Sequence, residues 1–265
     1  MKSETLNARR SETMSISPLV SIVTPAYNVA RHIQETIASV QAQTLVDWEL
    51  IVVDDCSKDE TVSVVRGFAD RDPRIRLIEQ EKNGGPAVAR QRALDAARAR
   101  YIAFLDSDDI WLPGKLEDQL AFMRKTGAAL TFTAFRRISE DGSSTGRLVG
   151  VPRRLSYRGL LKNTAIATST VIVDRAKTGS FSMTRTYYDD YALWLSILRS
   201  GHIAYGLRQD LMRYRVVSRS VSRNKGRSAY WVWRLYRDVE KLSLLRAIWC
   251  LMNYAVRASI KYRRF

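Results

Sequence analysis

The alternation of apolar, strand-like runs with segments of helical period constrains the fold of this chain more than any other feature, and it extends from Leu19 to Leu105. Four runs have the length and composition of buried strands: Val20 to Thr24, Leu50 to Val53, Ile75 to Ile78 and Tyr101 to Leu105. Between them apolar residues recur at helical spacing, as in Ile33, Ile37 and Val40, in Val62, Val65 and Phe68, and in Val88, Ala89, Leu94 and Ala96. Strands that alternate with helices form a parallel sheet, so this half is predicted to have an α/β fold of the nucleotide-binding type.

The rhythm becomes mixed after Pro113, which predicts a second half built on the same sheet. Helices are expected around Leu116, Leu120 and Met123 and at Tyr191 to Leu198. Strands are expected at Ala129 to Phe135, Ser169 to Val173 and Leu211 to Val216, and two amphipathic helices after Ser228. We therefore divide the chain into a flexible arm at 1–18, one domain at 19–222 with halves 19–112 and 113–222, and a helical extension at 223–265.

Three carboxylates follow the fourth strand within four positions, in Asp106-Ser107-Asp108-Asp109. Like charges this close repel one another unless a cation or hydrogen-bond donors share the site. Oxygen ligands favour Mg²⁺ or Mn²⁺, and nucleotides bind at the carboxyl ends of strands in open α/β sheets. The run therefore predicts a site for a metal and a diphosphate, with a solvated acidic turn as the alternative. A calcium loop of the EF-hand type is excluded, because Trp111 stands where that loop needs glycine.

The first two strands also end in polar segments at this edge, Thr24-Pro25-Ala26-Tyr27-Asn28 and Asp54-Asp55-Cys56-Ser57. The ring of Tyr27 suits stacking on a base, and a carboxylate at Asp54 or Asp55 suits accepting a hydrogen bond from the N–H of that base. The alternatives are a half-buried core or turn tyrosine and a pair of helix-capping aspartates before Thr61.

The chain carries a formal net charge of +16, which calls for an acidic partner such as nucleic acid, anionic lipid or a phosphorylated substrate.

The two cysteines, Cys56 and Cys250, match no disulfide or metal framework, as expected in the reducing cytoplasm. The segment from Met1 to Pro18 is polar and lacks the apolar core of a signal peptide.

Four motifs occur together in a fixed order: Pro25-Ala26-Tyr27-Asn28, Val53-Asp54-Asp55-Cys56-Ser57, Asn83-Gly84-Gly85-Pro86 with Ala89-Arg90, and Asp106-Ser107-Asp108-Asp109. This combination resembles the GT-A glycosyltransferases of family 2, which use nucleotide sugars, and the resemblance runs from about Leu19 to Ser222. A dinucleotide-binding Rossmann domain is disfavoured, because the chain has no G-x-G-x-x-G motif.

The resemblance implies a set of substrate contacts: Pro25, Tyr27 and Asp55 on the uracil or other base, Asp106 on the ribose, and Asn83, Gly84, Gly85 and Arg90 around the nucleotide sugar. It also implies that Asp108 is the direct ligand of Mn²⁺ or Mg²⁺. Glycines permit a close approach of the backbone to a diphosphate, and arginine offers a planar fork of donors. For Arg90 a structural salt bridge is the alternative.

The segment Tyr187 to Leu195 resembles the family motif in which Glu-Asp precedes Leu-Trp-Leu at a helix start, with Asp189 in place of the glutamate. This resemblance makes Asp190 the catalytic base and Asp189 a substrate-binding residue, while capping of the helix is the alternative and is compatible with both roles. Inverting transfer needs a single carboxylate base, because a metal and cationic side chains stabilise the leaving diphosphate.

Tyr214-Arg215-Val216 also resembles the family, in which a histidine frequently follows. Val217 stands in that place here, which removes a possible third protein contact to the metal. We expect Arg219 or Arg223 to cover the phosphates instead.

The C-terminal tail mixes aromatic with basic residues, the aromatics being Trp231, Trp233, Tyr236, Trp249 and Tyr254. Such a mixture suits the interface of an anionic membrane, and two helices packed on the domain with a solvated basic face are the alternative. The apolar window from Leu242 to Val256 contains Arg246 and is shorter than the ~20 residues that span a bilayer.

The resemblance is greatest to bacterial enzymes that build O-antigen or exopolysaccharide repeat units. It implies an inverting, metal-dependent hexosyltransferase that uses a UDP-sugar donor and a polyprenyl-diphosphate-linked sugar acceptor. The enzyme is expected in the cytoplasm, peripheral at the inner face of the plasma membrane, with no nucleic-acid partner. A nucleic-acid-binding protein and a nucleotidyltransferase are the alternatives. The first leaves the acidic run unexplained, and the second usually needs a glycine- and basic-rich loop that Thr24 to Asn28 lack.

Overall fold

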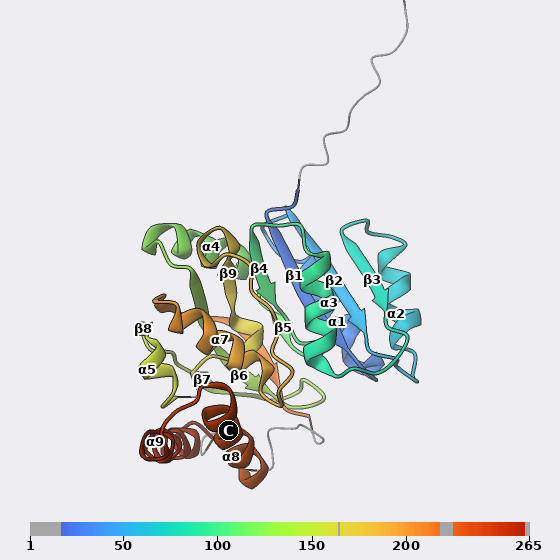
Figure 1. Ribbon diagram of the computed structural model, residues 1–265. Helices are drawn as coiled ribbons and strands as arrows, with labels where there is room; N and C mark the ends of the chain where they lie inside the picture. Colours follow the sequence, from blue (N-terminus) through green and yellow to red (C-terminus); the bar gives the residue numbers. More distant parts are fainter. Residues whose placement is uncertain (1–16, 164, 218–224, 263–265) are drawn as a thin grey trace, which may run out of the picture.

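The computed structural model describes residues 17–163, 165–217 and 225–262. The first half consists of β1 (Val20–Ala26), α1 (Ala30–Gln41), β2 (Trp48–Asp54), α2 (Thr61–Ala69), β3 (Ile75–Glu79), α3 (Pro86–Ala96) and β4 (Tyr101–Phe104). These four strands form a parallel sheet in the order β3-β2-β1-β4, as the alternation predicted. Its carboxyl edge is the place where the polar strand ends gather (Figure 1).

Alternate side chains of the central strands enter two separate cores, one on each face of the sheet. Ile22 and Leu50 are register partners and pack with α1, whereas Val23 and Ile51, one position further on, pack with α3. All four are fully buried. Strands that are buried on both faces have continuous apolar sequences, and that is why these strands were recognisable in the sequence.

The second half continues the same sheet, as expected. It contains β5 (Ile110–Trp111), α4 (Lys115–Thr126), β6 (Leu130–Ile138), β7 (Thr145–Val149), β8 (Arg154–Leu155), α5 (Tyr157–Leu160), η1 (Thr168–Thr170), β9 (Ile172–Asp174), α6 (Arg175–Thr178), α7 (Asp189–Arg199) and β10 (Ala204–Arg215). In the described residues the order is β3-β2-β1-β4-β9-β6-β10-β5, with β7 beside β6 and β8 beside β10. β9 runs antiparallel to both β4 and β6, so the sheet, expected to be mostly parallel, is mixed beyond its first half.

The strand expected at Ser169 to Val173 is wrong over its first half. Residues Thr168–Thr170 form a 3₁₀ turn, in which the hydroxyl of Thr170 donates to the carbonyl of Ala167, and β9 begins only at Ile172. The strand expected from Leu211 begins earlier, at Ala204. The short strands β5, β7 and β8 were not predicted, because two to five residues carry too little periodicity.

The tail forms the two expected helices, α8 (Lys225–Arg234) and α9 (Leu244–Tyr262), joined by the π-helical segment η3 (Leu235–Val239). The buried hydroxyl of Tyr236 donates to the carbonyl of Leu161, so Tyr236 belongs to the core and its expected place at a lipid interface is wrong. The ring of Trp231 stacks on Tyr187 with centroids 5.1 Å apart and planes 8° apart. Among the described residues no helix is long and apolar enough to cross a membrane.

A lysine is fully buried between α4 and the sheet. The ammonium group of Lys115 donates to Oε1 of Gln119 at 3.0 Å and lies 4.0 Å from the ring centroid of Trp111. Burial disfavours the charged form and holds the pKa of Lys115 well below 10.5.

This burial predicts a pH-dependent stability. The unfolded chain keeps the proton up to about pH 10.4 while the folded chain releases it at lower pH, so stability rises with pH between the two pKa values. We expect Lys115→Met to remove this rise, which amounts to about 1.4 kcal/mol per pH unit within that window. Urea unfolding at several pH values should show the advantage of the variant shrinking as pH rises, whereas the exposed Lys125→Met should keep the wild-type slope. Equal slopes for wild type and Lys115→Met would contradict this account.

Candidate active site

The loops after β1 and β2 are tied to each other at the carboxyl edge of the sheet. The backbone N–H of Lys58 donates to Oδ1 of Asn28 at 2.7 Å, and the N–H of Asn28 donates to the hydroxyl of Ser57 at 2.9 Å. Asn28 adopts a left-handed backbone conformation with φ of 49°, which Asn tolerates better than most residues. Pro25 is the second-last residue of β1. Tyr27, directly after the strand, is 51% exposed, so the tyrosine is not a core residue.

Asp55 anchors the glycine-containing loop. Its two carboxylate oxygens accept hydrogen bonds from the N–H groups of Gly84 and Gly85, each at 2.7 Å, and its carbonyl accepts from the Asn83 amide at 2.9 Å. The fold thus gathers four of the predicted substrate-binding residues. Gly85 has a φ of 81°, which glycine adopts without strain, and it directly precedes α3.

Capping of α2 by the aspartates at the end of β2 is not what the structure shows. Asp59 accepts from the N–H of Thr61 at 3.0 Å and also from the N–H of Ala30 at 3.1 Å, so it serves the starts of both α1 and α2. Asp54 instead accepts from the N–H of Ser57. Asp59 was not singled out from the sequence, although an aspartate two positions before Thr61 is a recognisable capping signal.

Arg90 joins the two halves of the site. Its buried guanidinium donates to Oδ1 of Asp106 at 2.6 Å and to Oδ2 of Asp189 at 2.7 Å. Burial opposes its charge, yet the carboxylates of Asp106, Asp189 and Asp190 together raise the pKa of Arg90. The salt bridge considered from the sequence is therefore present, and it links β4 to the start of α7.

Asp190 lies at the beginning of α7 and is partly exposed. Its Oδ2 accepts a short hydrogen bond from the hydroxyl of Thr168, and its Oδ1 accepts from the N–H of Tyr191 at 2.7 Å. Asp189 is buried, and burial raises its pKa while Arg90 opposes that rise. The residue that precedes the helix, Tyr188, makes no capping hydrogen bond with its side chain.

The carboxylates of the acidic run have different surroundings. Asp109 is buried, and its two oxygens accept from the hydroxyl of Ser169 at 2.5 Å and from the N–H of Arg215 at 2.9 Å. Burial raises the pKa of Asp109 well above its usual range. Burial and then the charge of Asp106 raise the pKa of Asp108 to about 6. Asp109 thus has a structural role, Asp106 gives one oxygen to Arg90, and Asp108 is the candidate partner for a metal.

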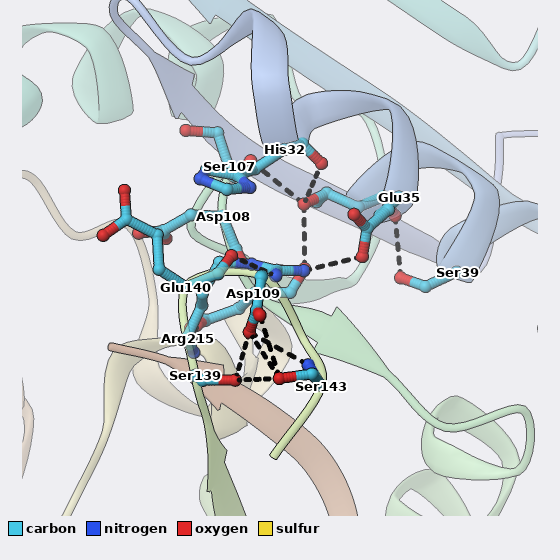
Figure 2. Close-up of polar contacts among 12 residues, drawn as sticks. His32, Glu35, Ser39, Ser107, Asp108, Asp109, Ser139, Glu140, Ser143 and Arg215 are labelled. Atoms are coloured by element: carbon cyan, nitrogen blue, oxygen red, sulfur yellow. Dashed lines mark hydrogen bonds and ion pairs between the residues drawn. The ribbon is translucent and has the colours of Figure 1, made fainter. Parts of the chain in front are cut away.

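Arg215, at the end of β10, holds the acidic run in place (Figure 2). Its guanidinium donates to the carbonyl oxygens of Asp108 and Glu140 at 2.9 and 2.8 Å and to Oε2 of Glu35 at 2.7 Å. Sequence reasoning noted Arg215 only as part of Tyr214-Arg215-Val216. Thr168 and Ser169 were also missed, although two adjacent hydroxyls in an apolar stretch are a visible signal.

A divalent ion fits the pair Asp106 and Asp108, whose mutual repulsion a cation relieves. Among the described residues no three side chains of His, Cys, Asp or Glu form a metal cage. Mg²⁺ is commonly held by one or two carboxylates together with substrate phosphates, which agrees with this donor set. Val217 supplies no ligand, and Arg219 and Arg223 lie outside the described residues.

Residues 21–191 match the family model of glycosyl transferase family 2. The chain belongs to this family. A putative teichuronic acid biosynthesis glycosyltransferase of Bacillus subtilis, TuaG, is 43% identical over 243 residues, 91% of this chain and 96% of TuaG. The UDP-Glc:alpha-D-GlcNAc-diphosphoundecaprenol beta-1,3-glucosyltransferase WfgD of Escherichia coli is 40% identical over 239 residues, 90% of this chain and 92% of WfgD.

Solved structures share the fold of this family 2 glycosyltransferase. Staphylococcus aureus TarS in complex with UDP-GlcNAc has a TM-score of 0.70 at 20% identity over 90% of this chain and 72% of that one. The mannosyltransferase PcManGT of Pyrobaculum calidifontis, in complex with GDP-Man and Mn²⁺, has a TM-score of 0.68 at 19% identity over 93% and 75%. The GT-A fold and the glycosyltransferase class predicted from the sequence are confirmed, in preference to a nucleotidyltransferase.

Loss of Arg215 should loosen the acidic run of this glycosyltransferase. In Arg215→Met the carbonyls of Asp108 and Glu140 lose their donor, and we expect a stability loss of about 2 kcal/mol. Faster amide hydrogen exchange across residues 106–110 should accompany it. The exposed Arg208 lies on the same strand, and Arg208→Met should leave that exchange unchanged. Unaltered exchange in Arg215→Met would contradict the proposed contact.

Loss of Arg90 should leave buried carboxylates unpaired. We expect Arg90→Met to lower the free energy of unfolding by about 3–5 kcal/mol, the usual cost of breaking a buried pair from one side. The double variant Arg90→Met/Asp189→Asn should recover part of the loss, because the buried charge is removed as well. Urea unfolding at pH 7 measures both. A double variant less stable than Arg90→Met alone would argue against the pair.

Proposed function

We propose that this enzyme is an inverting, metal-dependent hexosyltransferase that transfers from a UDP-sugar to a polyprenyl-diphosphate-linked sugar in bacterial surface polysaccharide synthesis. The observation that carries the proposal is the network through Arg90. It connects Asp106, at the strand end where a nucleotide sugar would lie, with Asp189, whose neighbour is the candidate base Asp190. The candidate donor-side and acceptor-side residues are thus connected through the guanidinium of Arg90.

The donor side is assigned to residues 19–112. Tyr27 offers an exposed ring for the base of the nucleotide, and the loop of Asn83, Gly84 and Gly85 is fixed by Asp55. Asp106 suits the ribose, and Asp108 would hold Mn²⁺ or Mg²⁺. When bound, such an ion neutralises charge that develops on the leaving diphosphate.

The acceptor side is assigned to residues 113–222, and Asp190 is its general base. The carboxylate takes the proton of the acceptor hydroxyl as that oxygen attacks the anomeric carbon from the face opposite the diphosphate. Thr168 donates to one oxygen of Asp190, which restricts the rotation of the carboxylate. The next residue, Ser169, donates to Asp109, so one 3₁₀ turn contacts both the base and the acidic run.

The relatives supply the choice of substrates. WfgD is named for UDP-Glc and for GlcNAc on diphosphoundecaprenol, and TuaG for teichuronic acid biosynthesis. An acceptor of that kind lies in a membrane, and the net charge of +16 suits an anionic surface. We therefore place the enzyme at the inner face of the plasma membrane, with residues 223–265 as the extension toward it.

Two substitutions test the proposal. Asp190→Asn should lower kcat by at least about a hundredfold with little change in donor KM, because a general base contributes that much. Asp108→Ala should abolish the response to Mn²⁺ or Mg²⁺. The assay follows transfer from a panel of UDP-hexoses to a lipid-diphosphate GlcNAc analogue, with NMR of the product to assign the anomeric configuration.

The matched control is Asp118→Asn, an exposed carboxylate on α4 that should have wild-type kinetics. Retained configuration in the product would exclude inversion. Wild-type turnover by Asp190→Asn would exclude Asp190 as the base.

A further inference from the structure

The helix α9 is apolar on two opposite faces. One face packs on the protein, where Ala247 and Cys250 are buried and Leu251 and Tyr254 are partly buried. These residues lie at helical spacing, as expected for a single buried stripe. A surface helix normally needs only this one stripe, so an apolar second face requires its own explanation.

The opposite face carries large apolar side chains that are exposed. Leu245 is 80%, Trp249 58%, Met252 60% and Val256 60% exposed, and Ile248 lies beside them. Spacings of four, three and four residues align the first four along the helix. We call these five residues the α9 ridge. Scattered apolar residues on a surface are ordinary, but a continuous ridge of this kind usually marks a contact surface.

Exposed basic side chains lie on α9 and just before it. Arg246 and Arg257 are exposed on α9, and Arg237 and Lys241 are exposed just before it. The exposed carboxylate of Asp238 is paired with Arg234 of the preceding turn. A protein partner for such a surface would have to be both apolar and acidic. A bilayer with anionic headgroups has both properties at once.

The position of the helices agrees with such a surface. Figure 1 shows α8 and α9 together at the end of the molecule toward which β1 and β2 run, the edge that holds the candidate active site. Trp231 of α8 stacks on Tyr187, two residues before Asp189. Tyr254 of α9 contacts Tyr191 of α7 with ring centroids 6.1 Å apart, so the helix that carries the ridge also packs on the acceptor side.

We propose that the α9 ridge inserts into the boundary between headgroups and acyl chains of an anionic bilayer, with the flanking arginines and lysine on the headgroups. The helix lies in the plane of the interface, as amphipathic helices with a basic flank do. The inference rests on the proposed function, which supplies a lipid-linked acceptor, and it identifies the residues that contact the lipid.

The test compares two double variants in flotation with vesicles of phosphatidylglycerol mixed with phosphatidylcholine. Leu245→Gln/Met252→Gln should weaken vesicle binding at least tenfold, and both residues are exposed, so the fold should be kept. The matched control, Val46→Gln/Leu148→Gln, changes two exposed apolar residues elsewhere and should bind as the wild type does. Equal binding by both variants would overturn the proposal.

Charge is tested separately with Arg246→Gln/Arg257→Gln. This variant should bind anionic vesicles more weakly and with less dependence on salt, because exposed charges are screened. Wild-type binding that is equally tight to vesicles of phosphatidylcholine alone would overturn the electrostatic part. Sedimentation without lipid provides the remaining check. A wild-type dimer that becomes a monomer in Leu245→Gln/Met252→Gln, without vesicle binding by either, would assign the ridge to a second copy.

Transfer to an acceptor analogue with a short, water-soluble chain separates this inference from the proposed function. The ridge variant should retain wild-type transfer there and lose it only with acceptor embedded in vesicles. Absence of transfer by the wild type with ridge-dependent vesicle binding intact would refute the proposed function and leave the lipid contact standing. Equal loss of transfer in solution and on vesicles by the ridge variant would overturn the lipid-specific role.

Discussion

The charge balance around Arg90 is the constraint on which the candidate active site depends. One buried guanidinium faces the carboxylates of Asp106, Asp189 and Asp190, contributed by a strand end and by a helix that begins 99 positions after Arg90. None of these groups is stable in a buried site alone, because an unpaired buried charge costs several kcal/mol. Together they fix the start of α7 against the end of β4, so a substrate bound there would meet a geometry already set by folding.

The three aspartates of the acidic run have different partners and therefore different roles. Both oxygens of Asp109 accept hydrogen bonds from Ser169 and the backbone of Arg215, and one oxygen of Asp106 accepts from Arg90. The backbone carbonyl of Asp108 accepts from Arg215, which leaves the Asp108 carboxylate as the candidate metal ligand. The repulsion between the carboxylates of this run is thus relieved by hydrogen-bond donors and by Arg90, and a bound cation would relieve the remainder. A cation is needed for only part of it, which is consistent with a site of few protein ligands.

The strands of the first half could be predicted because they are buried on both faces and have continuous apolar sequences. The second half was harder, since β9 reverses the strand direction and Ser169 and Thr170 belong to a 3₁₀ turn where a strand was expected. The candidate site residues were found by their motifs, but their partners were not. Arg90 with Asp189 and Arg215 with Glu35 join positions 99 and 180 apart, and no local pattern encodes such distances.

The stack of Trp231 on Tyr187 has a consequence for substrate selection. It packs the C-terminal helices against the segment that carries Asp190, so the helices and this carboxylate form one unit instead of being joined by a flexible tether. On a bilayer, the fold then sets the height of Asp190 above the lipid. If Asp190 is the general base proposed above, only an acceptor hydroxyl held at that height reaches it, so the separation between the lipid and the acceptor sugar would select the acceptor. The fold would then contribute to acceptor specificity as well as to catalysis.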